Sequence, residues 1–524
     1  MPKLTIDGKI VEVPPRTNLV EAGKKVNVVV PIYCYHPALS VVASCRMCQV
    51  ELHAPNQPVR LVAACRTEAL EGMQISTSGP DATRARAAVL EFLLANHPLD
   101  CPICDKAGEC DLQDYSFLYG SGQGRFEEKK REGVKHELIG NHILLDQERC
   151  IMCTRCVRFM DEYAKSPSLL VKGRGDQSVI ATFPGEKIQS NYEGNLSDIC
   201  PVGALTSKEF RFKSRVWDLC SSDSVCTLCD RLCTVRLEVK RGRLFRVRPI
   251  ENPQVNGWFM CDRGRFGLLD HCNPGERATR AFAGASSVGT ETAILALATK
   301  LRELRQELIC VLSARLSCEE ILLARRAFAP FVRPEGLLFL PAVEEGGDGI
   351  LYTGRQAANE AGLKLLGIRP ATDSELRAVL STGGPSAAVF FDHKDAERAQ
   401  ARASCAFLAL IDVVPRNLPE APLHADVFVP GLLFSEKEGT MINCSAILER
   451  LRRAQPAPEG VAGERSVLER LGDLLKADRT EIEGPDLTSA VTRALGLPQR
   501  TLAQIPRLGL KVPSSAPALE TARR

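Results

Sequence analysis

The sequence has no run of eighteen consecutive apolar residues, the length that a membrane-spanning helix needs. Its apolar segments VNVVVPIY (26–33) and LLFLPAV (337–343) are of the length found in protein cores. The N-terminus, MPKLTIDGKIVEV, alternates apolar and polar residues and lacks the basic segment and the apolar run of a signal peptide. We therefore expect a cytoplasmic protein that reaches a membrane only through a partner.

A large net charge is also absent. The 67 lysines and arginines oppose 64 aspartates and glutamates, which leaves a net charge of +3. This balance gives no reason to expect nucleic acid or a membrane surface as a partner. The hydrophobic fraction of 44% and the charged fraction of 25% are typical of soluble proteins, and a chain of 524 residues predicts several domains.

Cysteine, in contrast, is abundant. The chain has 21 cysteines, and 17 of them precede position 273. Because a large cytosolic protein is kept reduced, disulfides explain this number poorly. The cysteines fall into groups with short spacings, which indicates metal binding instead.

The pattern of apolar residues divides the chain into two halves. In the first half, Asp7-Gly8 between two alternating runs predicts a β-hairpin, and Asn18 with Glu21 three residues later predicts the start of a helix. Residues 81–95 have helical periodicity, with Asp81 as the expected N-cap. From about 276 onward, helical stretches alternate with short apolar runs, which predicts βα units and a parallel sheet.

The first set of candidate ligands is spaced C-x10-C-x2-C-x16-C. Small or β-branched residues precede its second cysteine, and such a loop can bring backbone N–H groups close to cluster sulfurs. These features favour a [2Fe–2S] cluster, with four-thiolate zinc as the alternative. The predicted ligands are Cys34, Cys45, Cys48 and Cys65.

The second set lies in HPLDCPICDKAGEC (97–110), which supplies only three thiolates, Cys101, Cys104 and Cys110. A [4Fe–4S] cluster needs four protein ligands, and His97 is the only soft donor nearby. Imidazole replaces thiolate on iron in Rieske centres. We therefore predict that His97 is the fourth ligand, while a histidine without a metal-binding role is the alternative.

The third and fourth sets predict two more [4Fe–4S] clusters. CIMCTRC with a remote Cys-Pro is half of the bacterial ferredoxin pattern C-x2-C-x2-C-x3-C-P, because Met160 stands where the local fourth cysteine would be. The third set is Cys150, Cys153, Cys156 and Cys200. The fourth set has the spacing C-x2-C-x3-C-x27-C, with structural zinc as its alternative, and consists of Cys226, Cys229, Cys233 and Cys261. The six remaining cysteines are scattered, so we expect small buried side chains: Cys220, Cys272, Cys310, Cys318, Cys405 and Cys444.

These four sets, in this order, resemble the large iron–sulfur subunit (G, or 75-kDa type) of bacterial NADH:quinone oxidoreductase, respiratory complex I. The resemblance implies a multidomain protein of α+β and α/β class, in which His97 binds a cluster. The implied domains are a β-grasp [2Fe–2S] ferredoxin-type domain (1–80), a 4Fe–4S domain with His(Cys)3 ligands (81–120), a 4Fe–4S ferredoxin-type domain (141–212), a 4Fe–4S domain of the Mo/W bis-MGD type (219–275), a degenerate molybdopterin-oxidoreductase-like α/β domain (276–480) and a weakly ordered tail (481–524).

The second half separates this family from others with a similar first half, namely [FeFe]-hydrogenases, diaphorase subunits of NAD-linked hydrogenases and NAD-linked formate dehydrogenases. ADVFVPGLLFSEKEGTMINC (425–444) is similar to a signature stretch of molybdopterin oxidoreductases. However, only residues 276–524 follow the fourth set, and we find neither the segment with a catalytic metal-binding cysteine nor the cysteine motifs of a hydrogenase active site. We interpret the second half as a truncated molybdopterin-enzyme domain that serves as a scaffold.

The resemblance implies an electron-transfer subunit of a translocating NADH:quinone oxidoreductase, with no substrate-converting site of its own. Electrons would come from a flavin-bearing NADH dehydrogenase subunit, enter near the first and second sets, and leave through the third set toward quinone-side iron–sulfur subunits. Since no G-x-G-x-x-G after a strand and no phosphate-binding loop is found, NADH, flavin and quinone are expected on partner chains. The implied location is the peripheral arm, on the cytoplasmic face of the inner membrane.

Two alternatives remain from the sequence. One is an iron–sulfur subunit of an NAD-linked formate dehydrogenase or hydrogenase assembly. The other is a catalytic molybdopterin oxidoreductase, which bound pterin and metal would reveal.

Overall fold

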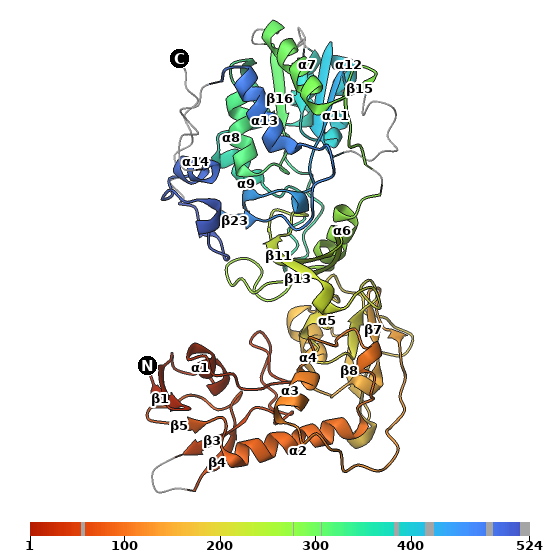
Figure 1. Ribbon diagram of the computed structural model, residues 1–524, viewed down its shortest axis with the longest axis vertical. Helices are drawn as coiled ribbons and strands as arrows, with labels where there is room; N and C mark the ends of the chain where they lie inside the picture. The colour runs from red at the N-terminus through yellow and green to blue at the C-terminus, as the bar shows by residue number, and fades with distance from the viewer. Residues whose placement is uncertain are drawn as a thin grey trace. The chain divides into compact units, whose positions relative to one another are not determined.

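The computed structural model describes residues 1–53, 58–275, 277–304, 307–381, 387–413, 424–477 and 486–513. The chain forms two compact units, Met1–Leu219 and Cys220–Arg524 (Figure 1). No helix in these described ranges is both long and apolar enough to span a membrane.

The first unit begins with a five-stranded sheet of order β2-β1-β5-β3-β4. The predicted hairpin is confirmed, since β1 and β2 pair antiparallel around Asp7 and Gly8, which both have positive φ. The predicted helix start is also confirmed, because the side chain of Asn18 accepts the N–H of Glu21 at 3.0 Å. The elements are β1 (Lys3–Ile6), β2 (Lys9–Glu12), α1 (Leu19–Lys25), β3 (Gln49–His53), β4 (Arg60–Ala63) and β5 (Gln74–Ser76).

Helix α2 (Pro80–Asn96) follows the sheet and packs on α3 (Asp111–Tyr119). The expected N-cap, Asp81, lies inside the first turn, and Gly79 takes the capping position without a side-chain bond. The buried carboxylate of Glu51, on β3, accepts the N–H of Asp81 at 2.7 Å instead. A carboxylate from a distant strand thus replaces the local cap that the sequence suggested.

The rest of the first unit consists of very short elements. Two small sheets have the orders β10-β7-β6 and β8-β9, and α4 continues into a single π-helical turn. The elements are β6 (Glu137–Leu138), β7 (Ile143–Leu145), α4 (Arg155–Arg158), η3 (Phe159–Tyr163), β8 (Leu170–Lys172), β9 (Val179–Ala181), α5 (Asn195–Ile199) and β10 (Leu205–Ser207).

The second unit opens with an antiparallel sheet, against which one helix packs. Strands β11 (Cys220–Val225), β12 (Thr234–Lys240) and β13 (Arg243–Pro249) are adjacent in this order, and α6 (Asp262–Cys272) lies on β13.

An eight-stranded sheet forms the core of the second unit, in the order β15-β14-β21-β20-β19-β16-β17-β18. Strands β16 to β21 run parallel, and the chain builds outward from β16 on one side and from β19 on the other. The predicted βα units are therefore confirmed as a doubly wound sheet. Its strands are β14 (Ala281–Ala283), β15 (Ser286–Val288), β16 (Leu308–Leu312), β17 (Val332–Phe339), β18 (Arg369–Pro370), β19 (Ala387–Phe390), β20 (Phe407–Asp412) and β21 (Val427–Pro430).

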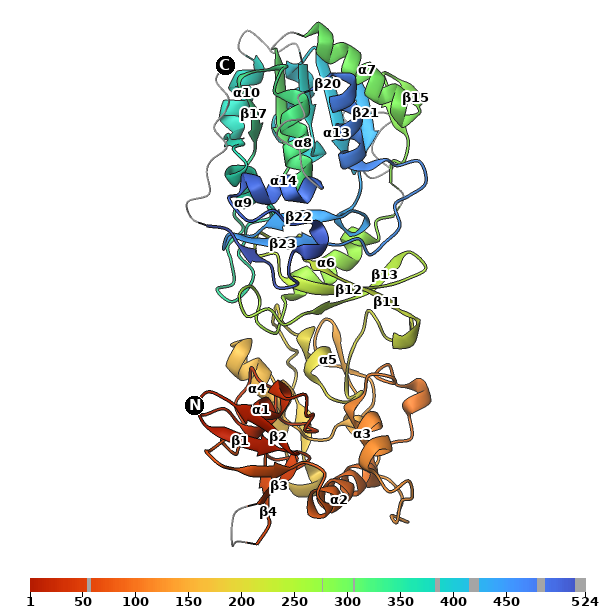
Figure 2. The ribbon, with the colours of Figure 1, turned by 60° about the vertical axis from the view of Figure 1, so that its left-hand side comes forward.

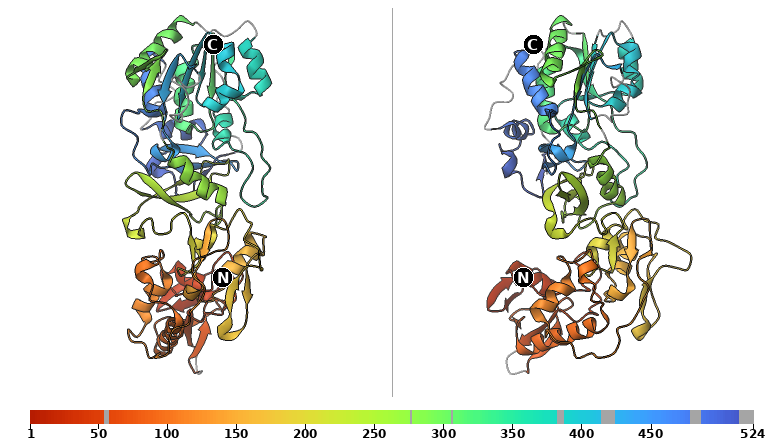
Figure 3. Two further views of the ribbon diagram at one scale, coloured as in Figure 1. Left: turned by 90° about the vertical axis from the view of Figure 1, so that its right-hand side faces the viewer. Right: turned by 45° about the vertical axis from the view of Figure 1, so that its right-hand side comes forward.

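Helices cover both faces of this sheet (Figure 3). Residues of α7 (Thr290–Glu303), α8 (Cys318–Phe328) and α13 (Gly463–Leu474) belong to one apolar core, and residues of α10 (Asp373–Ser381), α11 (His393–Arg398) and α12 (Ala401–Ser404) belong to the other. The remaining helix before the last small sheet is α9 (Glu360–Leu365).

The small sheet β22-β23-β24 lies beside the doubly wound sheet (Figure 2). Its strands are β22 (Gly439–Ile442), β23 (Ile447–Leu451) and β24 (Leu510–Lys511). Helix α14 (Leu487–Ala494) and β24 both lie beyond residue 480, where the sequence suggested a weakly ordered tail, and Val491 of α14 is buried in the core. The amphipathic helix at 487–494 anchors this region, whereas 514–524 lies outside the described residues.

Candidate iron–sulfur centres

The four cysteines of the first set meet at one end of the β3–β4 hairpin. Because Gln49 pairs with Ala63, the hairpin brings Cys48, just before β3, opposite Cys65, just after β4. The backbone N–H of Cys34 donates to the Sγ of Cys45 at 3.5 Å. Hydrogen bonds from the thiols of Cys45 and Cys65 lower the pKa of Cys34. Cys34 is therefore held in the thiolate form, the form that binds iron.

The second set lies around the end of α2 and the start of α3. His97 directly follows α2, and burial, together with the charge of Arg149, lowers its pKa to about 4. The imidazole is thus neutral, as a metal ligand must be. Cys104 and Cys110 are buried, and burial raises the pKa of both, that of Cys110 to about 11. Cys101 is exposed.

Arg149 connects His97 with the cysteines of the second set. Its guanidinium is close enough to influence the ionisation of both His97 and Cys104, and it pairs with Asp100 at 2.9 Å and Asp146 at 3.3 Å. This buried cation was not predicted, because nothing in the sequence links position 149 to the segment 97–110.

The third set lines one cavity completely. Its four cysteines share this cavity with apolar side chains that include Ile180 and Val202. Left-handed residues Met152 (φ 51°) and Thr154 (φ 58°) let the short CIMCTRC segment turn its thiols inward. Burial raises the pKa of Cys150 to about 12. Four thiols around one apolar cavity are the donor set and the shape that a cubane cluster requires.

The fourth set also lines a single cavity, in the second unit, together with Met260 and Tyr352. Cys261 caps α6, since its Sγ accepts the N–H of Gly264 at 3.3 Å. A Cβ on Gly264 would lie 3.2 Å from the Sγ of Cys226 and 3.3 Å from that of Cys261. Glycine at this position therefore leaves the space beside the sulfurs open.

The spacing of the donors favours clusters over single zinc ions. Tetrahedral zinc with bonds of about 2.3 Å holds its sulfurs about 3.8 Å apart. In the parts of the chain that the structure describes, one group of three or more His, Cys, Asp or Glu side chains has all its donor atoms within 4.8 Å of one another, and it consists of Asp392, His393 and Asp412. No three donors of any cysteine set close around a single point in this way, which fits ligands spread over a multi-iron cluster.

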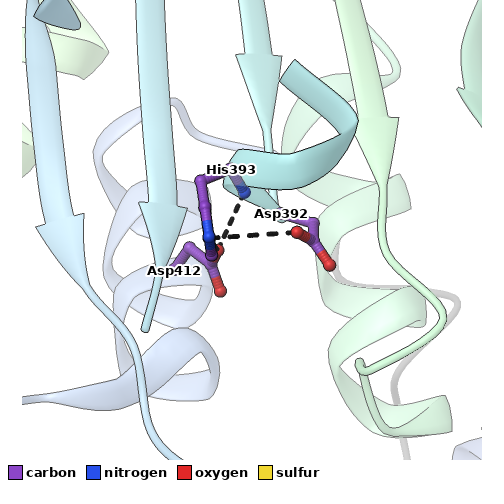
Figure 4. Close-up of side chains that lie close together, drawn as sticks. All are labelled: Asp392, His393 and Asp412. Carbon is purple, nitrogen blue, oxygen red and sulfur yellow. Dashed lines mark hydrogen bonds and ion pairs between the residues drawn. The ribbon is translucent and has the colours of Figure 1, made fainter. Parts of the chain in front are cut away.

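The group Asp392, His393 and Asp412 is a closed network of ion pairs (Figure 4). The Nδ1 of His393 lies 2.6 Å from Oδ2 of Asp412, and burial opposes the charge on His393 while this bond and both carboxylates raise its pKa above the usual value. The Nε of Arg315 lies 3.2 Å from Asp392. Since two cationic groups face two carboxylates, the network is neutral without a metal ion. It was missed in the sequence, where polar residues directly after β19 and at the end of β20 were the available signal.

Direct contacts join the first three sets within the first unit. Between the second and third sets, the backbone N–H of Asp111 donates to the carbonyl of Pro201 at 3.1 Å, and a Cβ on Gly203 would clash with the Sγ of Cys104. Between the first and second sets, the rings of Tyr33 and Tyr115 lie 5.4 Å apart.

The first and third sets are joined by arginine. The guanidinium of Arg158, at the end of α4, donates to the carbonyl of Cys34 at 2.5 Å and to that of Cys153 at 3.4 Å. Every pair of the three sets is therefore joined by a contact between residues at or near its ligands.

The cysteines outside the four sets are not all buried, although the sequence suggested that they would be. Four of them are buried, but Cys220 and Cys444 are exposed. Cys220 opens β11, at the edge of its sheet, and Cys444 lies in the connection between β22 and β23. Neither position packs against a second layer, so the prediction was wrong for these two residues.

Four family models match the first 273 residues. They are a 2Fe-2S iron-sulfur cluster binding domain (2–80), an NADH-ubiquinone oxidoreductase-G iron-sulfur binding region (86–125), the ferredoxin-like domain of NADH-quinone oxidoreductase subunit 3 (140–206) and a molybdopterin oxidoreductase Fe4S4 domain (221–273). The chain thus has one domain of the 2Fe–2S type and three of the 4Fe–4S type, and the predicted fold class is confirmed.

Curated relatives agree with this result. The chain is 42% identical over 267 residues to the G-type NADH-quinone oxidoreductase subunit of Streptomyces coelicolor, which covers 51% of this chain and 31% of the relative. It is 43% identical over 266 residues to the NADH-ubiquinone oxidoreductase 75 kDa subunit of Reclinomonas americana, over 51% of this chain and 38% of the relative. The chain therefore spans less than half the length of these relatives. A solved chain from an NAD+-reducing [NiFe]-hydrogenase has 28% identity and a TM-score of 0.36, covering 41% of this chain and 91% of that one.

Proposed function

We propose, because the iron–sulfur half of this chain belongs to the family of NADH:quinone oxidoreductase G, or 75-kDa, subunits, that the chain is an electron-transfer subunit of such a complex. In this proposal it receives electrons from a flavin-bearing NADH dehydrogenase partner and passes them toward quinone through iron–sulfur partner subunits. It contacts no nucleic acid, and it is part of a peripheral arm on the cytoplasmic face of the inner membrane, which it meets only through the complex.

The proposed ligands are those that the sequence predicted. A [2Fe–2S] cluster is held by Cys34, Cys45, Cys48 and Cys65, and three [4Fe–4S] clusters are held by the second set (His97, Cys101, Cys104 and Cys110), the third set (Cys150, Cys153, Cys156 and Cys200) and the fourth set (Cys226, Cys229, Cys233 and Cys261). When bound, these groups supply one-electron transfer, and the protein supplies their spacing, burial and hydrogen bonds.

One observation carries the proposal, namely that the first three sets are in direct contact within one unit. A relay requires that successive redox centres lie close together. The bond from Asp111 to Pro201 and the bonds from Arg158 to two ligand carbonyls provide this proximity without any intervening domain.

The same contacts favour an order of transfer. The third set has backbone or guanidinium contacts with both other sets, whereas the first and second sets meet through the aromatic rings of Tyr33 and Tyr115. We infer that the third set is the middle station between the first and the second. This differs from the order suggested by the sequence resemblance, in which the third set was the exit.

The arrangement of the second unit supports a scaffold role for the doubly wound domain. In such sheets, ligands bind outside the carboxyl ends of the strands where the winding reverses, which here is between β16 and β19. Asp392, His393 and Arg315 lie at this point and pair with one another and with Asp412. A neutral ion-pair network fills the position that a substrate or cofactor would need.

The metal content of the full chain tests the proposal. After anaerobic purification, one [2Fe–2S] and three [4Fe–4S] centres require about 14 irons with matching sulfide. We expect this content without stoichiometric zinc or molybdenum, and reduction of the clusters by NADH when the flavin-bearing partner is added. Molybdenum bound at one per chain would contradict the scaffold role, and a colourless, zinc-loaded chain would contradict the relay.

Two substitutions test the ligands. His97→Ala should remove the second cluster and lower the iron content by about four, whereas His136→Ala, which changes a half-exposed histidine of the same unit, should leave it unchanged. Cys153→Ser should remove the third cluster, with Cys220→Ser, exposed and outside every set, as its control.

A further inference from the structure

Arg155, in helix α4, reaches toward all three sets of the first unit. Its Nη2 donates to the carbonyl of Tyr35 at 2.6 Å, next to the first ligand of the first set. Its Nη1 donates to the carbonyl of Ile199 at 3.1 Å, next to the last ligand of the third set. Its charge also acts on Asp111, which follows the last cysteine of the second set: burial raises the pKa of this carboxyl, and Arg155 opposes the rise.

Arg158, one turn further along, touches only two of the sets. Its Nη2 donates to the carbonyls of Cys34 and Cys153, ligands of the first and third sets, and its Nη1 donates to the carbonyl of Ser40, in the loop of the first set. Within the described part of the chain, no hydrogen bond joins this guanidinium to the second set.

Neither guanidinium has a carboxylate within 4.0 Å among the residues that the structure describes, and the Nε of each is buried without a hydrogen-bond partner. Arg155 is only 7% exposed. A buried cation without a counter-ion is strongly unfavourable unless another negative charge compensates it. Thiolate-bound iron–sulfur clusters are anionic, and reduction adds one further negative charge to each.

We propose that Arg155 and Arg158 form a cationic junction between the clusters, which raises their reduction potentials and weakens the repulsion between neighbouring reduced clusters. This inference rests on the proposed function, since it needs clusters at the first three sets. Both arginines are positioning residues, because they act through backbone carbonyls at or next to the ligands and through their charge.

The contacts predict a specific pattern of effects. Arg155→Gln should make all three clusters harder to reduce, most strongly those of the first and third sets. Arg158→Gln should affect the clusters of the first and third sets and leave that of the second set unchanged. For the most affected clusters, we expect the ratio of reduced to oxidised form at a fixed solution potential to fall about tenfold, which is about 59 mV for a one-electron couple.

The experiment is a redox titration of the full chain, purified anaerobically and followed by electron paramagnetic resonance. The [2Fe–2S] signal is distinct from those of the cubes, and nitrogen hyperfine coupling identifies the cube with the histidine ligand. Arg155→Lys retains the charge and should keep potentials much nearer to the wild type than Arg155→Gln does. Arg174→Gln removes the same charge from an exposed position of the first unit and should change none of the three potentials.

The outcomes separate this inference from the proposed function. A wild-type chain without iron contradicts the proposed function before any arginine is changed. If either glutamine variant retains full iron and wild-type potentials, the junction is wrong, and it is also wrong if Arg155→Lys shifts the potentials as much as Arg155→Gln. If Arg155→Gln does not assemble its clusters, the selective pattern of Arg158→Gln decides.

Discussion

The strands of the first unit are short and partly exposed, whereas the central strands of the second unit are buried along their whole length. In the first unit, β8 has three residues, two of them exposed, and β4 has two exposed residues out of four. In the second unit, every residue of β16, β19 and β20 is buried. The second unit can therefore fold by burying apolar surface, while much of the first unit has little apolar surface to bury.

What the first unit has instead is ligands. Between Cys101 and Cys200, seven cysteines lie in or beside helices of three to nine residues, such as α4 and α5. Metal binding contributes folding free energy wherever a site does not exist in the unfolded chain. The comparison therefore teaches that the clusters are structural elements of the first unit, whereas the doubly wound domain of the second unit needs none.

Removal of iron should break the two units apart in stability, and this is the largest effect we expect. Chelation under reducing conditions should unfold the region 97–212 because its short elements depend on the ligands. The doubly wound domain should remain folded. Hydrogen exchange followed by mass spectrometry checks this, with protected β16 and β20 beside unprotected α4 and α5. Equal loss of protection in both units would contradict the comparison.

A single methyl group should remove one cluster from the first unit. In Gly203→Ala, the new Cβ would clash with the Sγ of Cys104, so that the ligand must move. We expect the iron content to fall by about four per chain while the other clusters remain. Gly124→Ala is the control, because no atom lies within 4 Å of its new Cβ. Full iron in Gly203→Ala would show that the second set tolerates the displacement.

In the second unit, a deletion from the core should cost stability and leave iron unchanged. Phe390, at the end of β19, is completely buried, and Phe→Ala substitutions in cores lower the free energy of unfolding by about 3–5 kcal/mol. Denaturant unfolding of the second unit measures this cost, with Leu295→Ala at a 43% exposed site of α7 as the control. Loss of iron from the first three sets in Phe390→Ala would mean that the two units fold together.

The features that the sequence predicted correctly are local or periodic. The hairpin at Asp7-Gly8, the cap at Asn18 and the buried runs that became β16 and β20 depend on neighbours within a few residues. The cysteine sets were recognisable for the same reason, since most of their ligands lie close together in the sequence, and the cavities around the third and fourth sets bring the predicted cysteines together.

The features that the sequence did not show depend on contacts between distant residues. Arg155 and Tyr35 are separated by 120 positions, and the cap of α2 comes from Glu51, 30 residues before Asp81. The exposed Cys220 and Cys444 depend on which strands lie at the edge of a sheet. No local pattern encodes such pairings, because an arginine that bridges two carbonyls looks in the sequence like any arginine on a helix.

The protonation of His393 should give the smallest effect, confined to the second unit. Its bond to Asp412 and the nearby carboxylates raise the pKa of His393 in the folded protein, against the opposing effect of burial. A raised pKa means that the histidine binds its proton more tightly when the protein is folded. The contribution of this histidine is therefore fully present below the unfolded pKa of about 6.5 and is lost as the pH rises through the folded value.

The free energy of unfolding of the second unit, measured from about pH 6 to about pH 9, should thus decline more steeply in the wild type than in His393→Gln, which cannot carry the charge. His424→Gln serves as the control, because it changes a second, exposed histidine of the same unit and should follow the wild-type curve. If His393→Gln instead gives the wild-type slope, the ion-pair network at the carboxyl ends of β19 and β20 contributes nothing that depends on this proton. The stability of the second unit would then come from its apolar core alone, which is the comparison with the first unit in its sharpest form.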